Sequence, residues 1–449
     1  MKKIFQYIML AVVTIVMASC TSDIEETTAT TGKNNVQLVV GEFPAFGDSQ
    51  TRAIGTPDEG KTSWAEGDEL ILEIAKTSYG RHSATFTYNG KSWELTSGEL
   101  VYLEGDPAYI PHVYYAPNYK WEAGKLVLKE GKDPGTDEYI EGNARITGNS
   151  ETITVSFAEA TRKYSRLRIA TLPNEQITVD TEYFTPAGSS DMEQNGNYTL
   201  TSDEKGNAYL YGTFENNSEV TVKYREAALT TYTFSQATES AKSYALDATV
   251  ISANSSEEIK SAIEQKVADG KTTIRLNLAP NAGTNEFMAI REAIKGAAPN
   301  DLGTIELTII GVETIPEEAF YKMLQLKSVR MSDVKEIKKY AFKECQYLTV
   351  VEAPSLNKLY SGAFKKCDQL SKLTFGPINY ADARNWPIFE YITPNIDLIL
   401  SDYQKEMIET DSYLYTANND RDYAGSDEHN SKNFLGREFR SITCRYKVK

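Results

Sequence analysis

The sequence predicts a multidomain protein in which an all-β region is followed by an α/β solenoid. Short runs of β-branched and aromatic residues, separated by Gly, Asn and Asp turns, fill residues 35–249. Between residues 311 and 376 one motif returns at an interval of 22 residues. A chain of 449 residues is also too long for a single hydrophobic core. We therefore expect two or three domains of different architecture.

The repeated motif is an aliphatic residue, then Ala-Phe, then Cys or Met, then Leu. A single repeat cannot bury its own apolar side, so a period near 22 predicts stacked rungs around a continuous core. The copies contain Ile315, Ile337 and Leu359; Ala319-Phe320, Ala341-Phe342 and Ala363-Phe364; Met323, Cys345 and Cys367; and Leu326, Leu348 and Leu370.

With Ala-Phe and the following Cys and Leu in register, these copies resemble the BspA-type leucine-rich repeat. The resemblance implies rungs of one strand and a short turn or helix, used for binding and adhesion and not for catalysis. The alternative is that the array is only a stable spacer. Candidate ligand contacts are the residues expected on the exposed side of the rungs: Arg330, Ser332, Thr349 and Lys372.

The segments flanking the repeats should cap the solenoid, giving a repeat domain over residues 250–449. Ser255-Ser256-Glu257-Glu258 is a capping box that predicts a helix ending near Gly270. We expect a strand over 272–278, a helix over 285–295 and a strand over 304–310. After the repeats we expect a strand over 395–400, a short helix over 402–408, a polar loop over 410–432 and a terminal strand element over 434–442.

The all-β region should be one β-sandwich, or two in tandem that divide near residue 160. Expected strands include residues 36–40, 69–74, 84–88 and 152–157, and Asn89-Gly90 predicts a two-residue hairpin turn.

Within that region, Thr51-Arg52-Ala53, Trp64, Gly67-Asp68 and the segment Tyr164 to Ile169 resemble the fimbrillin-like (Mfa-like) family. The resemblance implies a pair of transthyretin-like sandwiches, used in pili or as surface lipoproteins. It also implies that a protease could cut at Arg52-Ala53, after which the vacated groove would accept a strand of the next subunit. The alternative, which we favour, is that Arg52 and Ala53 lie in an uncleaved strand of a relative that does not polymerise.

The amino terminus predicts export and a lipid anchor. Residues 1–19 have the charged and apolar segments of a signal peptide, and Cys20 follows small residues as in a bacterial lipobox. Residues 20–34 form a polar tether whose acidic start resembles the export signal of outer-membrane surface lipoproteins. We therefore expect an outer-membrane protein, held by lipid on Cys20 and facing the exterior; the alternative is an ordinary secretory signal.

Composition excludes other classes. A formal charge of −16 argues against nucleic acid as a partner. The 3 histidines are scattered, and neither a catalytic nor a paired-cysteine zinc motif occurs. We expect no cofactor, no metal site and no enzyme. Cys345 and Cys367 occupy one slot of adjacent rungs, which favours a column of buried thiols over a disulfide.

These observations predict a surface lipoprotein that presents a repeat module for adhesion to a host or bacterial surface protein or glycan. The alternative is a fimbrial subunit, anchor or tip protein that assembles with other fimbrial subunits by strand exchange.

Overall fold

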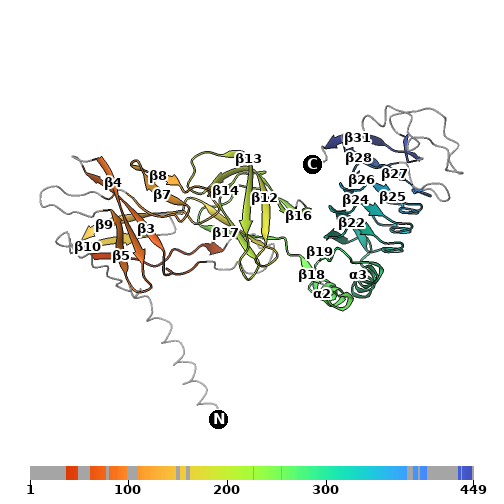
Figure 1. Ribbon diagram of the computed structural model, residues 1–449, viewed down its shortest axis with the longest axis horizontal. Helices are drawn as coiled ribbons and strands as arrows, with labels where there is room; N and C mark the ends of the chain where they lie inside the picture. Colours follow the sequence, from red (N-terminus) through yellow and green to blue (C-terminus); the bar gives the residue numbers. More distant parts are fainter. Residues whose placement is uncertain are drawn as a thin grey trace, which may run out of the picture.

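The protein consists of two curled β sheets followed by a short solenoid, arranged in that order along the long axis (Figure 1). The computed structural model describes residues 37–48, 61–76, 80–98, 110, 112–147, 152–157, 162–225, 227–253, 255–381, 388–392, 395–401, 433–435 and 437–446. The signal segment, Cys20, the tether, Arg52-Ala53, the expected helix 402–408 and the loop 410–432 lie outside these residues.

The first sheet has 7 strands in the order β1-β10-β9-β6-β3-β4-β5. Residues from both edge strands, Leu38 of β1 and Trp93 of β5, belong to one buried core, so the sheet curls around it. A separate hairpin is formed by β7 (Tyr119–Glu122) and β8 (Lys125–Leu128). The strands are β1 (Gln37–Val40), β3 (Glu69–Lys76), β4 (Gly80–Tyr88), β5 (Trp93–Gly98), β6 (Val113–Tyr115), β9 (Ile140–Thr147) and β10 (Thr152–Ser156).

The hairpin between β4 and β5 is confirmed, but the expected two-residue turn is wrong. The strands stop at Tyr88 and Trp93, which leaves a longer loop, and only Gly90 has a positive φ, of 87°. The Asn89 side-chain oxygen accepts hydrogen bonds from the backbone N–H groups of Lys91 and Ser92. These hydrogen bonds stabilise the wider loop, so Asn89 does not need the positive φ that the two-residue turn would require.

The second sheet has 8 strands, with the path β16-β15-β12-β14-β11-β17-β2 and β13 paired to β12. It encloses its own core, which includes Val179, Phe184 and Phe214. The chain from β1 to β2 crosses from the first sheet to the second, since β1 pairs with β10 and β2 pairs with β17. The strands are β2 (Gly47–Asp48), β11 (Ser165–Ala170), β12 (Gln176–Pro186), β13 (Glu193–Thr201), β14 (Asn207–Phe214), β15 (Glu219–Tyr224), β16 (Ala227–Thr233) and β17 (Lys242–Asp247).

The solenoid begins with a cap of two helices and three strands. Helix α2 (Ser256–Ala268) starts at Ser255, whose hydroxyl accepts the N–H of Glu258 at 3.2 Å, and Gly270 follows it with a positive φ. Helix α3 (Thr284–Ala297) buries Phe287 and Ile290. The strands β18 (Ile251–Ala253), β19 (Thr273–Leu278) and β20 (Ile305–Ile310) pair in parallel, so the cap belongs to the solenoid's own sheet. The expected amino-terminal cap elements are confirmed.

The rungs extend this main sheet in parallel and add a short sheet on another side (Figure 1). The slots predicted to be apolar are buried, and one core runs from Ala253 to Phe439. The main sheet continues with β22 (Leu326–Met331), β24 (Val350–Ala353), β26 (Lys372–Phe375), β28 (Asp397–Ser401) and β31 (Ser441–Tyr446). The short sheet contains β21 (Thr314–Ile315), β23 (Glu336–Ile337), β25 (Lys358–Leu359) and β27 (Tyr380–Ala381), and β29 (Asn433–Phe434) pairs with β30 (Arg437–Glu438).

Candidate functional site

Two columns of side chains run along the outward face of the main sheet. Strand residues alternate between core and surface, and Val329, Val351 and Leu373 point into the core with 0% exposure. The parallel register aligns the residues on the other face. The first column contains Thr273, Glu306, Ser328, Val350, Lys372, Asp397 and Ser441; the second contains Arg275, Thr308, Arg330, Glu352, Thr374, Ile399 and Thr443.

The outward face brings together two of the four predicted contact residues. Arg330 lies in the second column, and its Nε donates to the Glu352 carboxylate at 3.0 Å. Lys372 lies in the first column and is exposed, next to Asp397. Both side chains are therefore available at the surface of one sheet.

The other two predicted residues lie at the ends of strands. The Thr349 hydroxyl donates to the Lys327 carbonyl at 2.8 Å, and in the next rung the Ser371 hydroxyl donates to the Thr349 carbonyl at 3.1 Å. Thr349 thus links two neighbouring rungs. The sequence signal for this role is that a residue with a hydroxyl, Thr349 or Ser371, recurs at the same position of successive repeats. Ser332 follows the opposite end of β22 and is half-buried.

The repeats carry a charge opposite to that of the chain as a whole. Residues 311–376 contain 11 Lys and Arg against 8 Asp and Glu, a formal charge of +3, whereas the rest of the chain carries −19. Ion pairs join neighbouring rungs, as between Lys335 and Glu313 at 2.5 Å and between Lys358 and Glu336 at 2.6 Å. Such exposed pairs stabilise little individually, but they align charge along the solenoid.

Lysines and tyrosines alternate on the turns of the rungs. The Lys343 ammonium lies 5.0 Å from the ring centroids of both Tyr321 and Tyr340, and Lys365 lies 5.4 Å from the ring centroid of Tyr391. These distances are those of cation–π contacts. The turns therefore present a second polar face with aromatic and cationic groups.

The two repeat cysteines are buried free thiols. The Sγ atoms of Cys345 and Cys367 donate to the carbonyls of Phe320 and Phe342, each at 3.0 Å. Burial raises the pKa of Cys345 to about 12 and also raises the pKa of Cys367. A thiol held neutral in this way is a poor nucleophile and metal ligand, which fits a packing role.

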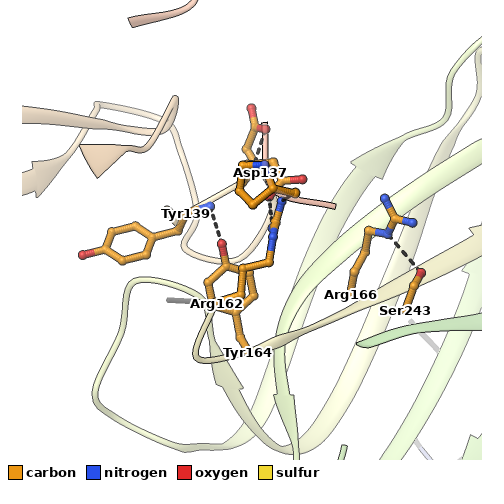
Figure 2. Close-up of polar contacts among 8 residues, drawn as sticks. Asp137, Tyr139, Arg162, Tyr164, Arg166 and Ser243 are labelled. Carbon is orange, nitrogen blue, oxygen red and sulfur yellow. Dashed lines mark hydrogen bonds and ion pairs between the residues drawn. The ribbon is translucent and has the colours of Figure 1, made fainter. Parts of the chain in front are cut away.

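The two curled sheets meet at a buried polar junction (Figure 2). Arg162, 1% exposed, donates from Nη1 to the Glu138 carboxylate at 2.6 Å and from Nη2 to the Pro44 carbonyl at 2.7 Å. The backbone N–H of Tyr139 donates to the Tyr164 hydroxyl at 2.9 Å. Sequence reasoning missed this junction, although a charged residue inside a β-rich segment was available as a signal.

Arg162 also lies against an aromatic ring of the crossing segment. Its guanidinium is 3.8 Å from the centroid of Phe46, and that of Arg166 is 4.8 Å from the same centroid. Arg166 in turn donates to the Ser243 hydroxyl at 3.0 Å. Residues 41–48, Glu138 and Arg162 therefore fasten the first sheet to the second.

Among the described residues, no group of three or more His, Cys, Asp and Glu side chains has an arrangement that could hold a metal ion. None of the helices in the described part of the chain has the length and hydropathy needed to cross a membrane.

The fold and its outward face define the class: a short parallel-strand solenoid that follows a β-rich region. The family model described as BspA type Leucine rich repeat region (6 copies) matches residues 302–410, and the chain contains such a region. No curated protein and no solved structure matches the chain.

The matched region is longer than residues 311–376, the segment that contains the three regular copies of the motif. One further rung is visible in the structure, because the N–H groups of Phe364 and Lys366 donate to the carbonyls of Ile388 and Glu390, repeating the bonds made between earlier rungs.

Proposed function

We propose that this protein is a surface-exposed outer-membrane lipoprotein that presents its leucine-rich-repeat module for adhesion or for binding of a protein or glycan. The observation that carries the proposal is the outward face of the solenoid, where two aligned columns of mostly polar and charged side chains lie on a rigid sheet. Binding sites on rigid strands are better preorganised than sites on loops.

A lipid anchor is part of the same proposal. A lipid on Cys20 would place the two curled sheets between the membrane and the solenoid, and the junction at Arg162 would make those sheets a stiff spacer. We propose that the two sheets are the transthyretin-like sandwiches of a fimbrillin-like region. This proposal rests on the sequence resemblance at Trp64, Gly67-Asp68 and the segment Tyr164 to Ile169.

Binding is tested with the soluble chain from residue 21 onward, presented to immobilised matrix proteins, mucins and co-resident bacteria. We expect binding that weakens when Arg330 and Lys372 are both changed to Glu. The matched control is Lys120→Glu with Lys125→Glu, the same change of charge at exposed positions of the separate β7–β8 hairpin, which should leave binding unchanged. If the chain binds none of these surfaces, the adhesion proposal is wrong. If binding falls equally in both variants, the outward face of the solenoid is not the binding site.

Location is tested in cells that express the full chain. We expect the wild type to incorporate a radiolabelled fatty acid and to be digested by protease added to intact cells, whereas Cys20→Ser should lose the label. A labelled protein that resists the added protease would be a lipoprotein that faces inward. A wild-type protein without label would exclude lipidation of Cys20.

A second candidate is a fimbrial subunit, anchor or tip protein. The favouring observation is that β1 and β2, both before Arg52 in the chain, lie at edges of their sheets. Cleavage at Arg52-Ala53 would let them leave, and a donated strand could replace them. After treatment with an arginine-specific protease we would then expect a ladder of assemblies that Arg52→Ala abolishes. A persistent monomer would contradict strand exchange.

A further inference from the structure

A polar pocket of about 190 Å³ lies where the second sheet meets the outward face of the solenoid. One wall is the edge strand β16, and the other is formed by β19, β20 and β22. The hydroxyl groups of its lining come from both walls: Thr230, Thr231, Thr273, Thr308 and Ser328. The pocket therefore depends on how two domains pack together.

Arg275 is the buried charged residue of this lining. It is 7% exposed, and its Nε donates to the Leu229 carbonyl of β16 at 2.6 Å. The nearest ion pair, with Asp247 outside the lining, is long, at 3.9 Å. A guanidinium carries five N–H donors, and the contact with Leu229 uses one of them.

A second arginine lies at the exposed rim. The side chain of Arg330 is 44% exposed and pairs with Glu352 on the neighbouring strand. Burial lowers the pKa of Arg275, and the nearby positive charge of Arg330 acts in the same direction, whereas Asp247 acts against it. The carboxylate in the lining, Glu306, is paired with Lys327 at 2.8 Å. An added anion would relieve the remaining repulsion.

The composition of the pocket identifies the kind of ligand. Arginine binds carboxylates through two parallel N–H donors, and hydroxyl groups exchange hydrogen bonds with the hydroxyls of a sugar. The volume is below the range of about 300–1,000 Å³ for drug-sized ligands, so it suits one charged group of a larger molecule. A protein partner would be expected to insert an apolar or aromatic anchor, for which this polar lining has no counterpart.

We propose that this pocket binds the carboxylate of an acidic sugar residue in a glycan ligand. The proposal deepens the proposed binding function and rests on it for the assignment of the ligand to a glycan. It also gives the junction between the second sheet and the solenoid a role in recognition, because Thr230 and Thr231 come from one side and Arg275 and Arg330 from the other.

The test measures binding of a hexuronate tetrasaccharide to the soluble chain by calorimetry, beside its methyl ester, sodium acetate and a tetraglutamate peptide. We expect the tetrasaccharide to bind and its uncharged ester to bind about ten- to a hundredfold more weakly, as does Arg330→Gln, because each removes a charged hydrogen bond. Glu352→Gln, which frees Arg330 from its partner, should bind at least as tightly as wild type. The control Lys125→Gln removes an exposed positive charge on the separate β7–β8 hairpin, outside the pocket lining, and should bind like wild type.

Three results would overturn the proposal: equal binding of the ester, acetate binding as tightly as the tetrasaccharide, or tetraglutamate binding as tightly, which would indicate an acidic protein segment. Equal losses of affinity in Arg330→Gln and Lys125→Gln would indicate a general effect of surface charge and not a specific pocket. If the chain binds matrix proteins or cells but not the tetrasaccharide, this inference fails and the proposed function stands. If it binds none of them, both fail.

Discussion

The ring of Phe389 stacks on the ring of Phe364, with centroids 5.6 Å apart and planes 8° apart. Phe364 stacks in the same way on Phe342, at 5.3 Å and 7°, and Phe342 on Phe320, at 5.0 Å and 20°. Edge contacts with Phe287 of α3 and with Phe439 extend this phenylalanine stack into both flanking segments. Phe389 thus occupies the Phe slot of a further rung, although 25 residues separate it from Phe364 instead of 22.

The phenylalanine stack should make Phe389 as important for stability as the Phe residues of the regular rungs. Removing a buried phenylalanine leaves a cavity, so we expect Phe389→Ala to lower the free energy of unfolding by about 3–5 kcal/mol, measured by urea denaturation. Tyr391→Ala is the control, because Tyr391 is 59% exposed, and should change it by less than about 0.5 kcal/mol. Similar small effects of both changes would mean that this segment is not part of the core.

The Arg162 junction should be sensitive to the loss of one partner. Removing Arg162 leaves the Glu138 carboxylate buried without its counter-ion, so we expect Arg162→Ala to destabilise the protein by about 3–5 kcal/mol. Replacing both residues together, as Arg162→Met with Glu138→Leu, should cost less. Lys163→Ala, which alters the exposed neighbouring pair with Glu141, is the control. Thermal unfolding gives the order, and a double variant less stable than Arg162→Ala would contradict this account.

The repeat thiols should be protected from alkylation by folding. Burial raises the pKa of Cys345 to about 12, so at pH 8 we expect iodoacetamide to modify Cys345 and Cys367 only after unfolding, as followed by peptide mass spectrometry. The half-buried Cys444 serves as an internal comparison and should react first. Since the folded state holds these protons more tightly, their contribution to stability is complete below about pH 9 and declines as the pH rises toward 12. Rapid modification of Cys345 in the folded protein would refute its burial.

The last strands of the main sheet are joined by an acidic group with a low pKa. Hydrogen bonds to Asp397 from Arg440, with Nε at 2.7 Å, and from the Ser441 hydroxyl at 2.7 Å lower its pKa to about 2. The stabilising effect is therefore present above about pH 4 and is lost as the pH falls toward 2. A carboxyl-carbon NMR titration should locate this transition, and Arg440→Ala should move the pKa upward toward that of a free aspartate. A pKa of Asp397 that is the same in both proteins would exclude the contact.

Much of the solenoid could be predicted because its contacts repeat at one spacing. The slots of Ile337, Ala341, Phe342 and Leu348 are buried as the period requires, and the Ser255 cap and Gly270 mark the ends of α2. The rung that contains Phe389 could not be predicted from the period, because it follows the previous rung at a longer spacing. Its hydrogen bonds and ring stacking nevertheless follow the regular pattern. For the candidate contacts, periodicity could place Arg330 and Lys372 on a surface but could not indicate that Arg330 has Glu352 as a partner.

The sequence by itself determined the β-rich region, the stacked rungs and the cap, because local propensity and a regular hydrophobic period act between residues close in the chain. Only the tertiary structure decided the junction of Arg162 with Glu138 and Pro44, and the pocket that Arg275 and Arg330 share with β16. Those contacts join residues as far apart as 118 positions, and their partners are chosen by how finished domains fit together. No periodicity records that choice, because each of these contacts occurs once.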